Sequence, residues 1–222
     1  MRTEIQVIRR GTVPYAEAWE LQRRLQAQRQ REEIGDLLLL LEHPPVYTRG
    51  RRSQPGELPM GVEWYEAQGI EVHDTDRGGL VTYHGPGQLV AYPIVQLRGY
   101  GDDVHEYVRG LERTMTGALG KVGVRASTIE GLTGVWVGTR KIGSIGLHVS
   151  RGVTTHGLAI NVNNDLQPFE WVVPCGLEGV SMTSLTRELG AAQDLGAFAA
   201  TLVDTYAEVF DREVVVDDSV AA

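Results

Sequence analysis

The sequence predicts one large domain that combines α-helices with β-strands, and three observations support this. The chain has 222 residues, which is enough to bury a core without disulfide bonds. Three stretches show the apolar spacing that is typical of helices, and segments rich in β-branched residues lie between them. No internal repeat, low-complexity tract or linker divides the chain, so residues 1–222 are expected to form a single domain.

The first helix is predicted after Pro14 and extends to about Glu33. Five residues recur at helical spacing in its first part: Tyr15, Ala18, Trp19, Gln22 and Leu25. The apolar run from Asp36 to Glu42 then predicts a fully buried strand, which ends before two prolines. Residues 48–61 are expected to form a loop, because they combine glycine, proline and serine with three arginines.

A second helix is predicted to begin at Asp102 or Asp103, because an aspartate there can cap the first turn and Glu106 lies three residues after Asp103. Its apolar face consists of Val104, Val108, Leu111, Met115 and Leu119. The last helix is predicted after Asp194, with a face formed by Leu195, Phe198, Ala199, Leu202, Val203, Tyr206, Val209 and Phe210. The β-rich segments are residues 70–75, 79–83, 88–97, 124–129, 134–149 and 153–162.

The net charge of −8 is unevenly distributed. Residues 161–222 carry 2 basic and 11 acidic side chains, whereas residues 1–60 carry 10 basic and 8 acidic ones. The one dense basic cluster is Arg49, Arg51 and Arg52, so the sequence offers no basic stripe for nucleic acid. We therefore expect no nucleic-acid partner, and we interpret the acidic C-terminal part as a solubility feature.

Cysteine usage and hydropathy indicate a cytoplasmic protein. The single cysteine excludes an internal disulfide, a CxxC redox pair and a multi-cysteine metal site. The longest apolar run, residues 37–41, is far shorter than a membrane span of about 18 residues, and the N-terminal sequence lacks the apolar segment of a signal peptide. We expect no membrane partner.

Glycine is enriched in the middle of the chain. It accounts for 27 of the 222 residues, about 12% against a usual ~7%, and 17 of the 27 lie between residues 77 and 161. Two runs concentrate it, residues 77–88 and 141–148. Hairpin turns would explain these runs, and so would a ligand that lies along bare backbone.

Cys175 and Lys141 are the candidate catalytic residues. Cys175 lies between Pro174 and Gly176, which favour a tight loop that can present the thiol, although a lone cysteine can also be a buried apolar residue. A free thiol has a pKa of about 8.5 and needs a partner to ionise at neutral pH. Only 2 of the 21 basic residues are lysines. Lys141 follows an apolar strand, so its amine either enters a semi-buried site beside the thiol or remains on a solvated hairpin.

The histidines His84, His148 and His156 are candidate metal ligands, since imidazole is a common ligand. No pair has HxH or HxxxH spacing, and no carboxylate lies among them in a compact pattern, so we expect no metal. The sequence contains neither a GxGxxG motif after a strand nor a P-loop. These absences disfavour a nucleotide site and an oxidoreductase, and we expect no cofactor.

Four separated motifs resemble the lipoyl(octanoyl) transferase family. They are LLLLEHPPVYTRGRR at residues 38–52, RGGLVTYHGPGQLVAYP at 77–93, KIGSIGLHVSRGVTTHGLAINV at 141–162 and PCGLEGVSMTSL at 174–185. Their order and spacing match the family over nearly the whole chain. The resemblance implies an α/β fold of the biotin and lipoate protein ligase type: a mixed sheet with packed helices and a second small sheet, forming one octanoyltransferase catalytic domain.

The resemblance also implies an activity, partners and site residues. The activity is an acyltransferase reaction, the first step of endogenous protein lipoylation, which moves octanoyl from octanoyl-acyl carrier protein to the lysine of a lipoyl domain. The acceptors would be the lipoyl domains of 2-oxoacid dehydrogenases and the glycine cleavage H protein. Cys175 would carry the acyl group and Lys141 would activate it. The acyl-binding residues would be Arg77, Gly78, Gly79, Leu80, Val81, Thr82, Tyr83, His84, Ser144, Ile145, Gly146, Gly157, Leu158 and Ala159.

Chemical reasoning agrees with this activity but leaves alternatives open. Transfer from a thioester to a thiol and then to an amine ends in a stable amide, so it requires no ATP. The alternatives are an ATP-dependent lipoate or biotin ligase of the same fold, an amidotransferase that moves octanoyl between lipoyl domains, and a protein that only binds a lipoyl domain. The arginine cluster at 49–52 is expected to dock the acidic carrier protein, unless it is only a solvated loop.

Overall fold

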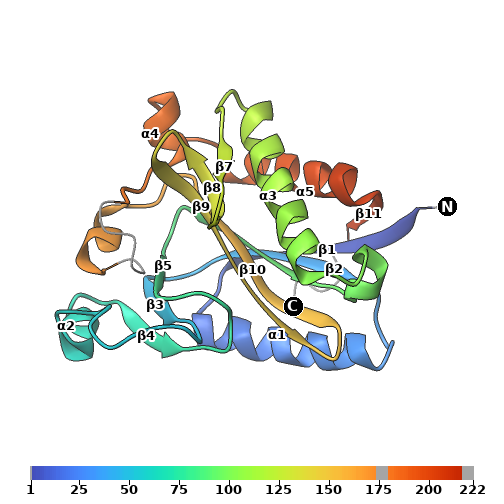
Figure 1. Ribbon diagram of the computed structural model, residues 1–222, viewed down its shortest axis with the longest axis horizontal. Coiled ribbons are helices and arrows are strands. Elements are labelled where there is room, and N and C mark those ends of the chain that lie inside the picture. The colour runs from blue at the N-terminus through green and yellow to red at the C-terminus, as the bar shows by residue number, and fades with distance from the viewer. Residues whose placement is uncertain (1, 174–179, 217–222) are drawn as a thin grey trace.

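A large mixed sheet forms the centre of the computed structural model, which describes residues 2–173 and 180–216 (Figure 1). Its eight strands follow the order β11-β1-β2-β6-β10-β9-β8-β7. Strands β11, β1 and β2 are parallel to one another, and every later pair is antiparallel. The bounds are β1 Thr3–Thr12, β2 Leu37–Glu42, β6 Gln88–Ile94, β7 Ser127–Ile129, β8 Leu132–Val137, β9 Arg140–Ser150, β10 Val153–Asn161 and β11 Arg212–Val216.

A second, three-stranded sheet lies beside the main sheet. Strand β3 (Val46–Arg49) pairs in parallel with β4 (Glu71–Asp74) and antiparallel with β5 (Thr82–His84). The helix α2 (Val62–Ala67) packs on β4, and the η2 turn (Gln167–Trp171) contacts β5. Aromatic residues hold this unit together: Tyr47, Tyr65, Tyr83 and Phe169 are all buried.

Helices cover both faces of the main sheet (Figure 1). On one face α3 (Val104–Lys121) packs against α5 (Leu195–Phe210), and on the other lies α1 (Tyr15–Gln30). Strand β2 shows why both layers are needed: Leu38 and Leu40 contact the α3 side, whereas Leu37, Leu39 and Leu41 contact the α1 side. The continuous leucine run is thus a strand buried on both faces, as the sequence predicted.

The predicted helix starts are confirmed by their caps. The Asp103 carboxylate accepts the N–H groups of His105 at 2.7 Å and Glu106 at 3.2 Å, and Asp194 accepts the Ala197 N–H at 3.0 Å. Helix α1 begins after Pro14, as predicted, and ends at Gln30, three residues before the predicted end. None of the helices in the described ranges is long and apolar enough to cross a membrane.

Several elements differ from the sequence prediction. Thr48 and Arg49 are not in a loop, because they continue β3 and pair with His73 and Asp74 of β4. The predicted segment 134–149 is two strands, β8 and β9, joined by a turn. The sequence did not predict the strands β1 and β11 or the short helices α2 and α4 (Leu185–Leu189), because charged side chains interrupt the strands and the helices span only one or two turns.

Close backbone contacts explain part of the glycine excess. A Cβ on Gly146 would lie 2.9 Å from the Gly78 carbonyl oxygen, and a Cβ on Gly157 would meet the carbonyl oxygen of Ala91 on β6. Both glycines therefore allow neighbouring backbones to approach, whereas others in this region, such as Gly79 and Gly87, have a positive φ that favours glycine.

We expect Gly157→Ala to lower the free energy of unfolding by about 1–3 kcal/mol, because the added methyl overpacks the β6–β10 contact. Urea unfolding followed by circular dichroism measures the change. Gly35→Ala is the matched control, since a Cβ there has no heavy atom within 4 Å and its effect should stay below about 1 kcal/mol. Equal stability of the two variants would contradict the packing argument.

Candidate active site

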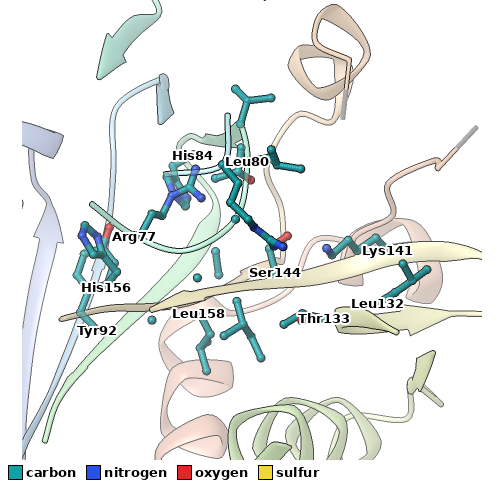
Figure 2. Close-up of a pocket in the computed structure, with 18 of the residues that line it drawn as sticks. Arg77, Leu80, His84, Tyr92, Leu132, Thr133, Lys141, Ser144, His156 and Leu158 are labelled. Carbon is teal, nitrogen blue, oxygen red and sulfur yellow. The ribbon is translucent and has the colours of Figure 1, made fainter. Parts of the chain in front are cut away.

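A cavity of about 300 Å³ lies between the two sheets, where the loop at residues 77–81 approaches β9 and β10. This volume is at the lower end of small-ligand sites. In Figure 2, Lys141 lies at one end of the cavity and Arg77 and His156 lie at the other. Of the fourteen predicted acyl-binding residues, twelve line it: Arg77, Gly79, Leu80, Val81, Thr82, His84, Ser144, Ile145, Gly146, Gly157, Leu158 and Ala159.

The register of β9 and β10 brings two of the predicted stretches together. Ser144 pairs with Ala159, Ile145 with Leu158, and Gly146 with Gly157. Residues that are 11–15 positions apart in the sequence are thus neighbours on one sheet surface. The Leu147 carbonyl accepts the Gly78 N–H at 2.8 Å, so it points away from β10, and strand alternation turns the Ile145 N–H toward the same edge.

Two predicted residues do not line the cavity. Gly78 bonds to Leu147 and attaches the loop to β9. Tyr83 points the opposite way from its neighbours Thr82 and His84, because successive side chains of β5 alternate between faces. Its ring packs against Tyr47 and Phe169, with centroids 5.4 Å apart in each pair. Tyr83 therefore belongs to the aromatic core of the small sheet and does not line this cavity.

Arg77 ties the loop to the small sheet. Its side chain is buried and donates to Thr48: Nε to the hydroxyl at 3.1 Å, and Nη2 to the carbonyl at 2.5 Å and the hydroxyl at 2.8 Å. The backbone adds bonds from the Arg51 N–H to the Arg77 carbonyl and from the Arg52 N–H to the Gly79 carbonyl. The cavity wall is consequently held from both sheets before any ligand binds.

An irregularity in the main sheet determines the direction of the Lys141 side chain. The pairing of β8 with β9 shifts register between Val135 and Trp136, at the position opposite Lys141. Such a bulge redirects a side chain. The Lys141 Nζ lies 5.3 Å from the centroid of the Trp136 ring, and a Cβ on Gly134 would be 2.8 Å from Lys141 Cε. In Figure 2 the side chain points along β9 toward Ser144.

The chain passes beside Lys141 again after residue 179. The Lys141 N–H donates to the Ser181 carbonyl and its carbonyl accepts the Thr183 N–H, each at 2.9 Å. On the other side, the Val173 N–H donates to the Glu57 carbonyl at 3.0 Å. Cys175, the predicted nucleophile, lies outside the described residues.

A buried polar network connects the far end of the cavity to Lys141. The Gln88 amide donates to Asn161, the Asn161 amide donates to the Thr183 carbonyl, and the Thr183 N–H donates to the Lys141 carbonyl. His84 joins this chain through its bond to Gln88 at 2.7 Å. Because each buried group has a partner, the network fixes both ends of the cavity relative to each other.

Two buried histidines are neutral: His84 in the cavity wall and His43 behind it. Burial lowers the pKa of His43 to about 4 and that of His84 to about 3, with the nearby His43 also lowering the latter. The His43 Nδ1–H donates to the Val13 carbonyl, which leaves Nε2 to accept the Tyr92 hydroxyl at 2.7 Å. These side chains act as fixed dipoles and not as charges.

His156 occupies a strained position in the cavity wall. Its φ is +56° within β10, and the buried amide of Gln22 accepts its backbone N–H at 2.6 Å. Burial lowers the pKa of His156, and its Nε2–H donates to Asp76 at 2.7 Å, which lowers the pKa of that carboxyl. His148 lies 3.7 Å from the same carboxylate.

The three histidines do not form a metal centre. His148 and His156 meet at Asp76, whereas His84 belongs to the separate group with His43 and Gln88. Within residues 2–173 and 180–216, no group of three or more His, Cys, Asp or Glu side chains is arranged to hold a metal ion.

The cavity contains residues that sequence reasoning missed. They are Tyr15, Arg52, Tyr92, Gly131, Leu132, Thr133 and His156. Tyr15 matched the apolar face of a helix and Tyr92 a buried strand, so neither carried a functional signal. Among the described lining residues Arg52, Arg77 and Lys141 are basic and no Asp or Glu is present. In a chain of net charge −8, the cavity is thus a local positive region.

The arrangement of the two sheets and the helices identifies the structural class of this protein. The fold superposes on a bi-partite lipoate protein ligase from Thermoplasma acidophilum with a TM-score of 0.72 and 15% identity, covering 98% of this chain and 87% of that one. A biotin protein ligase from Aquifex aeolicus gives a TM-score of 0.53 and 12% identity, covering 93% of this chain and 69% of that one. The fold is therefore that of the lipoate and biotin protein ligases, as the sequence predicted.

Sequence comparison narrows the class to a family. The family model "Lipoyl protein ligase A/B catalytic domain" matches residues 14–207. An octanoyltransferase from Chloroflexus aggregans is 48% identical over 214 residues, covering 95% of this chain and 96% of the relative. The chain belongs to the lipoyl protein ligase A/B catalytic domain family and, within it, to the octanoyltransferases, which are acyltransferases.

We expect the neutral histidines to make the fold acid-sensitive. An unfolded histidine binds a proton near pH 6.5, whereas His43 in the fold does so only near pH 4. Its contribution to stability is therefore complete above pH 6.5 and is lost as the pH falls toward 4, about 3 kcal/mol for this residue. Guanidinium unfolding at pH 7, 5.5 and 4.5 measures the slope.

The matched variants are His43→Gln, which removes the titrating group, and His105→Gln, which removes an exposed one. His43→Gln should flatten the dependence of unfolding free energy on pH, and His105→Gln should leave it unchanged. A wild-type slope retained in His43→Gln would contradict this assignment.

Proposed function

We propose that the chain transfers octanoyl from octanoyl-acyl carrier protein to the lysine of a lipoyl domain, through a thioester on Cys175. This would be the first step of endogenous protein lipoylation, with acceptors such as the lipoyl domains of 2-oxoacid dehydrogenases and the glycine cleavage H protein. The observation that carries the proposal is the placement of Lys141. Its amine enters a cavity lined by the predicted acyl-binding stretches, and its backbone bonds to Ser181 and Thr183, close after Cys175 in the chain.

In the first half-reaction a thiolate attacks the donor thioester. The Cys175 proton passes to the Lys141 amine, and the resulting ammonium stabilises the thiolate. The thiolate forms a C–S bond to the octanoyl carbonyl, and the donor C–S bond breaks. The departing donor thiolate takes the proton from Lys141, so the enzyme is left as the acyl thioester with a neutral lysine.

In the second half-reaction the acceptor lysine attacks the enzyme thioester as a neutral amine. Lys141 takes a proton from the attacking nitrogen, the bond to the Cys175 sulfur breaks, and an amide forms. Thiolate and ammonium remain and return to the starting state by proton transfer. In both steps the Ile145 N–H, which faces the edge of β9, is suited to stabilise the carbonyl oxyanion.

The apolar part of the cavity suits an eight-carbon chain. Leu80, Val81, Ile145 and Leu158 contribute to its lining, and the octanoyl group would extend from Lys141 toward Tyr92. Each buried methylene contributes about 0.8 kcal/mol. Neighbouring chain lengths are then distinguished by only about 1–3 kcal/mol.

The transferase, ligase and amidotransferase activities can be distinguished by the octanoyl donor and the ATP that each requires. Incubation with octanoyl-acyl carrier protein and an apo lipoyl domain, without ATP or Mg²⁺, should give the octanoylated domain. A requirement for ATP would favour the ligase, and octanoyl transfer only from another lipoyl domain would favour the amidotransferase. A binding module would show no transfer in any of these assays.

We expect Cys175→Ala to abolish turnover and the covalent octanoyl adduct seen in the intact mass of the wild-type protein. The chain has no other cysteine, so a thioester adduct on the wild type assigns the residue directly. Retained transfer by Cys175→Ala would exclude the thioester mechanism.

We expect Lys141→Arg to separate the two half-reactions. Arginine keeps the positive charge but does not release a proton in the accessible pH range, so thiolate formation is supported whereas proton removal from the acceptor amine is not. Single-turnover assays should show the Cys175 adduct but a loss of about 10²-fold or more in transfer to the lipoyl domain. The control is Lys121→Arg, because Lys121 is exposed and paired with Glu208. Equal rates of Lys141→Arg and wild type in both steps would rule out the proton-transfer role.

The proposed carrier-protein patch is smaller than the sequence indicated. Arg49 is bound to Asp74, with its Nε 2.7 Å from a carboxylate oxygen. Arg51 and Arg52 are exposed. These two arginines therefore provide the positive charge with which this loop would attract an acidic carrier protein.

A further inference from the structure

A second pocket lies next to the cavity between the two sheets, and we call it the entry groove. It is lined by Gln54, Pro55, Glu57 and Val173, together with Arg52 and Leu80, which also line the cavity. Arg52 and Leu80 therefore mark the junction. A long ligand can continue from the cavity across this junction to the exposed loop at residues 52–57.

Arg52 is the cationic group at the junction. Among the residues that the structure describes, no carboxylate lies within 4 Å of its guanidinium, whereas Arg49 is paired with Asp74. The one acid of the groove, Glu57, is buried and accepts the Val81 N–H at 3.1 Å, so its carboxylate is engaged with the loop at 77–81. The groove thus presents a positive charge whose counter-charge is not supplied by the described part of the chain.

The backbone around Arg52 is held in place. The Arg52 N–H donates to the Gly79 carbonyl at 3.1 Å, the Gln54 amide donates to the Arg52 carbonyl at 3.1 Å, and the Ser53 N–H donates to the Gly50 carbonyl at 2.9 Å. The side chain is exposed but its base is fixed, so little backbone ordering is needed when an anion binds.

We propose that Arg52 binds the phosphate of the phosphopantetheine arm that carries the acyl group on the donor. This inference rests on the proposed function, because it assumes a carrier-protein thioester. With the acyl chain and thioester in the cavity, the portion of the donor that crosses the entry groove is the arm. The arm is a chain of neutral amides whose one charged group is its phosphate, and a guanidinium recognises phosphate through paired N–H donors.

The test compares two small donors that differ only in the phosphate: S-octanoyl-4′-phosphopantetheine and S-octanoyl-pantetheine. The readout is the ratio of their kcat/KM values, in which any general loss of activity cancels. We expect wild type to prefer the phosphorylated donor, and we expect Arg52→Gln to lower this preference about tenfold, in the range of a charge-assisted hydrogen bond. Arg51→Gln is the matched control, because Arg51 is equally exposed but lines neither the cavity nor the groove.

Each other outcome overturns the proposal. An unchanged ratio in Arg52→Gln, with both donors losing activity equally, would place Arg52 at the reacting carbonyl. If Arg51→Gln lost the preference for the phosphorylated donor to the same extent, the preference would come from the overall positive charge of the loop and not from Arg52. If wild type showed no such preference, the protein would have no binding site for the phosphate. Failure of the proposed function looks different: wild type would then transfer octanoyl from neither donor and form no Cys175 adduct.

Discussion

The contact between the glycine loop and strand β9 is the constraint on which the site depends. The Gly78 N–H reaches the Leu147 carbonyl only because Gly146 has no side chain to separate the two backbones. Arg77, which precedes Gly78 in the chain, is hydrogen-bonded to Thr48 of the small sheet. One short loop therefore joins both sheets, and the cavity is the space that remains between them. A bulky residue at 146 would disturb the relative position of the sheets as well as one wall of the cavity.

The cavity combines buried neutral histidines with basic lining residues. His84 in the cavity wall and His43 behind it are kept neutral by desolvation, and their ring nitrogens bond to Gln88, Val13 and Tyr92. The walls carry cationic groups and, within the described lining, no carboxylate. The neutral state of His43 and His84 avoids the cost of burying further charge beside the buried Arg77, and Lys141 and Arg52 are the basic groups available to a thiolate, an oxyanion or a phosphate.

The sequence predicted what local patterns determine and missed what the tertiary structure determines. Helix caps at Asp103 and Asp194 and the buried strand at 37–42 are local, and they were located within a few residues. The motifs did not predict the pairing of β9 with β10 or the direction in which the Tyr83 side chain points, because both depend on how the strands are arranged in the fold. Tyr15, Tyr92 and His156 come from three separate elements and carry ordinary core patterns, so only the fold could bring them to the cavity. Glycine enrichment left hairpin turns and ligand contact as alternatives, and at Gly146 and Gly157 the structure shows close approach between neighbouring backbone segments instead.

The shared fold does not by itself determine the chemistry. The ligases that this chain resembles in structure are related at 12–15% identity, so the likeness shows the arrangement of sheets and not the reaction. An acyl slot between the sheets is useful to any enzyme that handles such a group. A ligase that starts from a free acid must first activate the carboxyl group, whereas a thioester donor is already activated and needs only a nucleophile and a proton carrier. In the proposed reaction Cys175 and Lys141 meet that smaller requirement. The register shift between β8 and β9 lies opposite Lys141, and residues 181–183 bond to its backbone, so in the proposed reaction a local irregularity in a common sheet would position the proton carrier.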